Sequence, residues 1–185
     1  MEILDVVDKY GVPTGETVDR SVAHQKGIRH RTSHVWLFRR RNGVLEVLLQ
    51  KRSLNKDSFP GCFDISTAGH IPAGDDFIPS AIREAREELG VTLYENEFIY
   101  CGQRCFEFQE NFHGKLFRDC QVSNVYAVFK NLEAADFQIQ KEELEAVIWM
   151  DFEECKKAVA ENHIPNCIWM EELDMLDDTL KNKIV

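Results

Sequence analysis

One segment, residues 77–89, constrains the fold more than any other part of this 185-residue chain. On a helical wheel of about 100° per residue, its apolar side chains fall on one stripe, formed by Ile78, Ala81, Ile82, Ala85 and Leu89. Asp76 precedes the segment at an N-cap position, and Gly90 follows it where a left-handed residue ends a helix. The sequence therefore predicts a helix that packs one face against a core.

The same helix carries three carboxylates on one flank. Glu84, Glu87 and Glu88 lie beside the apolar stripe, and Arg83 and Arg86 lie on the other flank. Carboxylates this close raise one another's pKa unless a cation sits among them. Hard oxygen ligands suit Mg2+ or Mn2+, so the flank predicts a metal site, with a solvated charged face as the alternative.

Strand and helix patterns alternate along the rest of the chain. Residues 2–19 predict a strand–turn–strand, and Asn42-Gly43 predicts a tight hairpin. The other expected strands are 32–41, 44–50, 98–110, 115–130 and 147–151, and the other expected helices are 20–26, 152–161 and 171–181. The segment 66–74 holds several backbone breakers and predicts no element. This order indicates the α/β class with a mixed sheet.

The composition restricts the partners and the location. The chain carries 22 Lys and Arg against 32 Asp and Glu, a net charge of −10, which argues against nucleic acid as a partner. No stretch approaches the ~20 apolar residues of a membrane span. Residues 1–9 lack the apolar core of an export signal, so the six cysteines are interpreted as reduced thiols and the location as cytoplasmic.

A spaced pattern that includes the acidic helix resembles the Nudix box, Gly-x5-Glu-x7-Arg-Glu-U-x-Glu-Glu-x-Gly-U, in which U is apolar. The matching residues are Gly69, Arg83, Glu84, Ala85, Glu87, Glu88, Gly90 and Val91, within residues 69–91. One position departs from the pattern, because Asp75 stands where the family has glutamate. The resemblance implies an α/β/α sandwich around a mixed sheet, here a single domain over residues 1–185 with 1–30 as an N-terminal extension.

The resemblance also implies residue roles. Nudix enzymes cleave a nucleoside diphosphate linked to another group and use a divalent metal ion, here Mg2+ or Mn2+. Glu84, Glu87, Glu88 and the Gly69 carbonyl match the family's metal ligands. Arg83 matches the arginine that orients a glutamate, and Asp75 matches its carboxylate partner, one methylene shorter and therefore looser.

A general base completes such a reaction, and its position varies within the family. Glu143, in the acidic turn before the 147–151 strand, is the candidate, and a solvated turn is the alternative. Water attack at phosphorus on a small-molecule diphosphate substrate is the predicted reaction, with Glu84, Glu87, Arg83 and Glu143 as catalytic residues.

The chain outside the box resembles isopentenyl-diphosphate isomerases and the Nudix hydrolases similar to them. Arg52 and Lys56 match residues that hold the diphosphate, with a solvated loop as the alternative. The isomerase's metal histidines correspond to His24, His30 and His70. Three departures favour hydrolysis: Ala68 replaces the proton-transferring cysteine, Val122 and Asn124 replace a glutamate pair, and the Nudix box is complete. Without that glutamate pair, a histidine metal site is expected to be weak or absent.

Several questions stay open at this level. The alternatives to a hydrolase are an isopentenyl-diphosphate isomerase and a catalytically silent nucleotide-binding module. The substrate is not predicted, and the oligomeric state is open, a homodimer included. Core packing is expected for the aromatic residues Trp36, Phe59, Phe63 and Trp169, with stacking against a base as the alternative. The acidic stretch at 171–178 is interpreted as a charged helix face.

Overall fold

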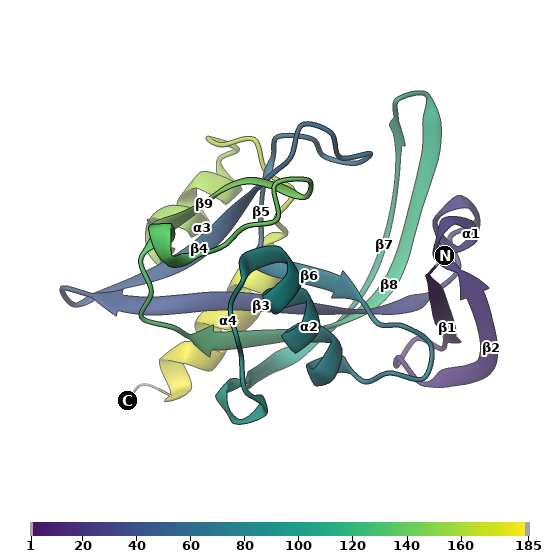
Figure 1. Cartoon of the computed structure of the whole chain (residues 1–185), viewed down its shortest axis with the longest axis horizontal. Coiled ribbons are helices and arrows are strands. Elements are labelled where there is room, and N and C mark those ends of the chain that lie inside the picture. The colour runs from purple at the N-terminus through teal and green to yellow at the C-terminus, as the bar shows by residue number, and fades with distance from the viewer. Residues whose placement is uncertain (1, 184–185) are drawn as a thin grey trace.

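In the computed structural model, which describes residues 2–183, a mixed seven-stranded sheet is covered by helices on both faces (Figure 1). Its strands run in the order β5-β4-β3-β8-β7, with β6 paired to β3 and β9 paired to β4. β3 and β8 are parallel, and the other pairs are antiparallel. This is the predicted α/β/α sandwich.

The sheet strands are β3 (His30–Arg41), β4 (Val44–Arg52), β5 (Phe63–Asp64), β6 (Thr67–His70), β7 (Ile99–Phe112), β8 (Lys115–Phe129) and β9 (Leu144–Asp151). Asn42 and Gly43, both at positive φ, turn β3 into β4 as predicted. β6 lies in the segment for which no element was expected. It has four residues, too few for an alternating pattern, and its pairing with β3 holds it in place.

Helices pack on opposite faces of β3. On one face, α2 (Phe77–Leu89) buries its apolar stripe against Val35 and Leu37. On the other face, α3 (Phe152–Ala160) and α4 (Met170–Lys183) pack against Trp36 and Phe38. A short 3-10 turn, η1 (Glu95–Glu97), lies between α2 and β7, and a second one, η2 (Ala134–Asp136), lies between β8 and β9. Among residues 2–183, no helix has both the length and the apolar character needed to cross a bilayer.

The predicted ends of α2 are confirmed. The side chain of Asp76 accepts a hydrogen bond from the Phe77 N–H, and Gly90 adopts the left-handed conformation after the last turn. Cys62, Cys105, Cys120, Cys155 and Cys167 are free thiols.

The N-terminal segment forms a small hairpin and a helix beside the sheet (Figure 1). The hairpin consists of β1 (Ile3–Val7) and β2 (Pro13–Asp19), and α1 (Arg20–Lys26) follows, capped by Asp19. An ion pair of 2.8 Å between Arg31 Nη2 and Asp5 Oδ2 joins the hairpin to β3. α1 packs against β8 and carries His24 into the cavity described next.

Candidate active site

One cavity of about 1540 Å³ gathers the site residues predicted from the sequence. Its lining includes Arg52, Lys56, Gly69, Arg83, Glu84, Glu87, Glu88 and Glu143. The cavity follows both sides of β6, because Gly69 faces α2 whereas its neighbour Ala68 packs toward the opposite core. Ligand pockets usually measure about 300–1,000 Å³. This one has room for a diphosphate and for the group attached to it.

Gly69 and Glu84 are in close contact at the centre of the cavity. A Cβ atom built on Gly69 would lie 2.2 Å from Cγ of Glu84, so no larger residue fits without displacing the carboxylate. Burial, together with the charge of Glu87, raises the pKa of Glu84 to about 6 even though Arg83 lowers it. The glycine therefore allows the backbone of β6 to approach this acidic side chain.

Glu88 is the most deeply buried of the three helix carboxylates. Thr67 donates a hydrogen bond of 2.7 Å to its Oε2 atom. Burial raises the pKa of Glu88 to about 8, and the negative charge of Glu84 contributes to this rise. A buried carboxylate of this kind is stabilised in its charged form by a bound cation.

Arg83 contacts two of the glutamates. Its Nη2 atom lies 2.9 Å from Glu84 Oε1, and its Nη1 atom lies 3.7 Å from Glu87 Oε2. The expected pair of Arg83 with Asp75 is not formed among the described residues, which corrects that prediction. The shorter aspartate instead contributes its backbone oxygen, which accepts a hydrogen bond from Arg31 at 2.9 Å.

The α2 carboxylates fit a hard divalent cation chemically. Their donors are oxygen atoms, and the Gly69 backbone lies against one of them. Each carboxylate already has a neighbour: Arg83 holds Glu84 and Glu87, and Thr67 holds Glu88. Glu84, Glu87, Glu88 and Gly69 are the residues that could hold Mg2+ or Mn2+.

Two predicted phosphate-binding cations line the same cavity. Lys56 forms an ion pair with Glu143, the candidate base. Arg52 is held by Asp64 at 3.0 Å and by the carbonyl oxygens of Ser58 and Phe59. The Arg52 guanidinium therefore orders the 53–62 loop, whereas Lys56 and Glu143 connect this loop to the start of β9.

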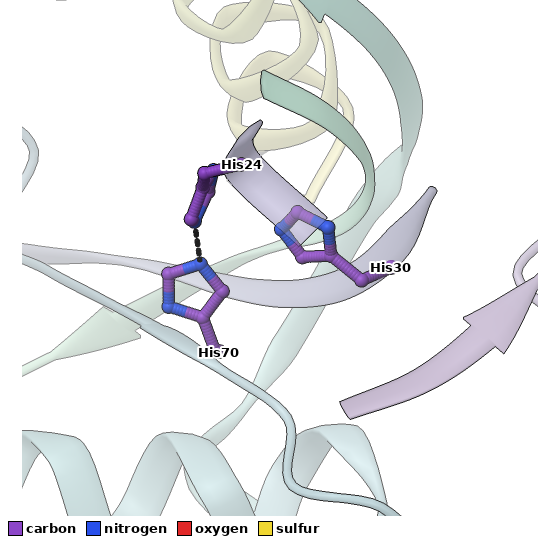
Figure 2. A group of neighbouring side chains, drawn as sticks. All are labelled: His24, His30 and His70. Atoms are coloured by element: carbon purple, nitrogen blue, oxygen red, sulfur yellow. Dashed lines mark hydrogen bonds between the residues drawn. The ribbon is translucent and has the colours of Figure 1, made fainter. Parts of the chain in front are cut away.

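Three imidazoles meet on the other side of β6 (Figure 2). His24, His30 and His70 each place one ring nitrogen within 4.8 Å of the others, and the Nε2 atoms of His24 and His70 are 3.0 Å apart. Nδ1 of His30 donates to the Ile28 carbonyl at 2.8 Å, so Nε2 keeps its lone pair. That Nε2 atom has no hydrogen-bond partner among residues 2–183.

The electrostatics of this cluster keep the rings neutral. Burial lowers the pKa of His24 to about 4, and burial also lowers the pKa values of His30 and His70. Neutral imidazoles are the form that binds metal ions. The three rings therefore offer nitrogen ligands that suit a transition metal better than Mg2+.

A carboxylate missed by the sequence analysis lies beside the imidazoles. Asp119 Oδ1 is 3.7 Å from both His24 Nδ1 and His30 Nε2 and has no hydrogen-bond partner within the described part of the chain. The expectation of a weak or absent histidine metal site rested on Val122 and Asn124 and did not take this carboxylate into account, so metal binding here stays a prediction. Asp119 was missed because the sequence does not fix the register of β8 against β3.

We expect these histidines to bind about one zinc or manganese ion. His30→Ala should remove that ion, because His30 contributes an unpartnered Nε2 at the centre of the group. Elemental analysis after dialysis against Zn2+ would measure the loss. His163→Ala, which removes an exposed histidine outside the cavity, serves as the control. Equal metal contents in the wild type and His30→Ala would contradict the prediction.

The fold and the cavity define a class of protein, an α/β/α sandwich whose cavity is lined by carboxylates of α2. The NUDIX domain model matches residues 28–169. The chain belongs to the Nudix hydrolase family.

Known proteins support this assignment. The chain is 41% identical over 157 residues to Nudix hydrolase 3 of Arabidopsis thaliana. The match covers 83% of the chain and 20% of the plant protein, so the chain spans about a fifth of that relative's length. It is 31% identical to an isopentenyl-diphosphate Delta-isomerase of Escherichia coli, with 79% and 75% of the two chains covered. The crystal structure of DR0079 from Deinococcus radiodurans aligns with a TM-score of 0.68 at 18% identity, covering 94% of this chain and 98% of that one.

Proposed function

We propose that this chain is a hydrolase that depends on a divalent metal ion and cleaves the diphosphate linkage of a nucleoside diphosphate derivative or a related small molecule. The observation that carries the proposal is the contact of Gly69 with Glu84 in a cavity that Glu87 and Glu88 also line. Mg2+ or Mn2+ bound by these groups supplies positive charge that polarises phosphorus and lowers the pKa of water. We propose that residues 1–185 act as one catalytic domain, with 1–30 as its extension.

Each residue has a proposed part in the reaction. Arg83 holds Glu84 and Glu87 in position through its two ion pairs. Glu143 accepts a proton from the attacking water molecule. The oxygen of that water forms the new bond to phosphorus, the anhydride P–O bond breaks, and the phosphate on the other side of the anhydride leaves. Lys56 binds the phosphate oxygens, as does Arg52 where its guanidinium faces the cavity.

An isomerase remains the second candidate, because of the resemblance to the Escherichia coli enzyme. Ala68, next to Gly69 in the cavity, has no group that transfers a proton to an alkene carbon. This residue favours hydrolysis. Incubation with isopentenyl diphosphate separates the candidates, since an isomerase forms dimethylallyl diphosphate and a hydrolase releases phosphate.

The proposed function is tested with a panel of diphosphate compounds. Nucleoside di- and triphosphates, nucleotide sugars, dinucleotides and prenyl diphosphates are incubated with the protein and Mg2+ or Mn2+, and phosphate or monophosphate products are measured. We expect turnover of at least one class that stops when the metal is chelated. A protein that binds panel compounds but turns none over would be a silent binding module.

Glu143→Gln is expected to slow turnover by roughly 10²–10⁴-fold while metal binding is retained. The expected cause is loss of the group that takes the proton from water. The fall should be in kcat while KM stays within about twofold, whereas loss of a purely structural ion pair with Lys56 would disturb substrate binding as well. Glu145→Gln is the control, because Glu145 lies two residues away and outside the cavity lining. An unchanged rate would remove Glu143 from the mechanism.

A further inference from the structure

A row of aromatic side chains forms the wall of the cavity on the side of β7. Phe106 and Phe108 point the same way from β7, with ring centroids 6.0 Å apart and planes only 13° from parallel. Trp169 lies just before α4, and its ring centroid is 4.7 Å from that of Phe106. All three residues line the cavity. Trp169 is 41% exposed, so the expectation of core packing for it was wrong, whereas it was right for the fully buried Trp36.

A buried arginine on the same face of β7 contacts this wall and also lines the cavity. The guanidinium of Arg104 lies 4.3 Å from the centroid of Phe106 and 5.6 Å from that of Trp169. Two ion pairs of 2.8 Å, to Glu171 and Glu172, hold the guanidinium in place. The rings therefore keep their positions before any ligand enters, which lowers the ordering cost of binding.

A polar group lies among these rings. Gln121 is directly opposite Phe106 in the β7–β8 register, and paired residues of an antiparallel sheet share a face. Its side-chain amide makes no hydrogen bond to another described residue, and it lines the cavity. An amide both donates and accepts hydrogen bonds, as the edge of a nucleobase requires. A saturated chain would leave the amide unpaired, at a free-energy cost.

We propose that this wall, made of Phe106, Phe108 and Trp169 with Gln121 beside them, binds the nucleobase of the substrate. The proposal rests on the proposed function, because it places the base in the same cavity as the carboxylates of α2. The base stacks on the exposed face of Trp169 and its edge bonds to Gln121. The substrate class is then a nucleoside diphosphate derivative rather than a prenyl diphosphate.

Binding is measured by isothermal titration calorimetry with the Glu87→Gln protein, so that no turnover interferes and the readout does not depend on a tryptophan. The probes are AMP, GMP, CMP and UMP, with ribose 5-phosphate as the matched compound without a base and dimethylallyl diphosphate as the prenyl compound. We expect at least one nucleotide to bind more tightly than ribose 5-phosphate.

Two variants in this background test the stacking. Trp169→Leu and Phe106→Leu keep apolar volume but remove a ring, and each should weaken nucleotide binding about tenfold to hundredfold. Ribose 5-phosphate binding should not change. Tyr100→Leu, an exposed aromatic residue of β7 outside the cavity, is the control and should leave nucleotide binding unchanged.

Three results would overturn the proposal: equal affinity for the nucleotides and ribose 5-phosphate, unchanged nucleotide affinity in both leucine variants, or tighter binding of the prenyl compound. These binding measurements do not depend on whether the protein hydrolyses any compound. Base-dependent binding without turnover of any panel compound by the wild type would refute the proposed function alone, and turnover without base-dependent binding would refute this inference alone.

Discussion

Glu87→Gln should reduce phosphate release from a diphosphate substrate by roughly a hundredfold to a thousandfold. The change keeps the shape of the side chain and removes one negative charge from the flank of α2. Glu87 is half-exposed in the cavity, and its recorded ion-pair partner is Arg83, so the protein should fold normally. The expected loss is therefore catalytic, and it is measured as kcat/KM at saturating Mg2+.

Glu95→Gln is the matched control for this experiment. Glu95 is an exposed glutamate of η1 that does not line the cavity, and the same chemical change there should leave the rate within about twofold of the wild type. If Glu87→Gln and Glu95→Gln behaved alike, the carboxylates of α2 would have no part in the reaction.

The second large effect concerns stability. Glu172→Ala should lower the free energy of unfolding by about 3–5 kcal/mol, which corresponds to a fall in Tm of roughly 10 °C. Glu172 is only 2% exposed. Its carboxylate accepts hydrogen bonds from His34 Nδ1 at 2.8 Å, Trp36 Nε1 at 3.0 Å and Arg104 Nη1 at 2.8 Å. Its removal leaves three buried donors without this acceptor, and two of them, His34 and Arg104, also lose its negative charge.

Glu171→Ala provides the comparison at the adjacent position. Glu171 also pairs with Arg104, at 2.8 Å, but its side chain is mostly exposed. A solvated pair of this kind contributes at most about 1 kcal/mol. Urea unfolding should separate the two variants clearly, and equal losses would show that burial of Glu172 has no energetic importance.

The same network predicts a dependence of stability on pH. Burial raises the pKa of Glu172, but the charges of His34 and Arg104 outweigh burial and lower it to about 2, from an ordinary value of 4.5. This contribution is fully present above pH 4.5 and is lost as the pH falls toward 2. Burial lowers the pKa of His34, but Glu172 outweighs burial and raises it above 6.5, so that contribution is lost as the pH rises through the raised value.

The network should therefore stabilise the wild type most between about pH 4.5 and 6.5. The measured quantity is the difference in unfolding free energy between the wild type and Glu172→Gln at several pH values. We expect this difference to shrink as the pH falls below 4.5. A constant difference from pH 3 to 7 would contradict the assigned shifts.

Local sequence signals were sufficient for much of the fold. The apolar stripe of 77–89, the Asp76 cap and Asn42-Gly43 each act within a few residues, and each was placed correctly. The residues of the acidic pattern lie in one cavity, although their catalytic roles stay predictions. β6 was missed because its conformation depends on β3 rather than on its own four residues.

The rest depends on contacts between distant parts of the chain. Glu172 was interpreted as part of a charged helix face, which was wrong, because its partners Arg104 and His34 are 68 and 138 positions away. Asp119 was missed for the same reason, since its place beside His24 and His30 follows from strand register. No pattern within a single segment carries information of this kind.

The cavity follows both sides of β6, with the α2 carboxylates on one side and the β7 rings on the other. The proposed roles assign bond breaking to α2 and base recognition to β7 and the segment before α4, which are separate parts of the chain. Under this proposal, mutations in β7 or at the beginning of α4 should change which compound is accepted while the α2 carboxylates stay as they are. Because these two sets of residues lie on separate segments, the fold is a suitable starting point for directed evolution of new substrate specificities.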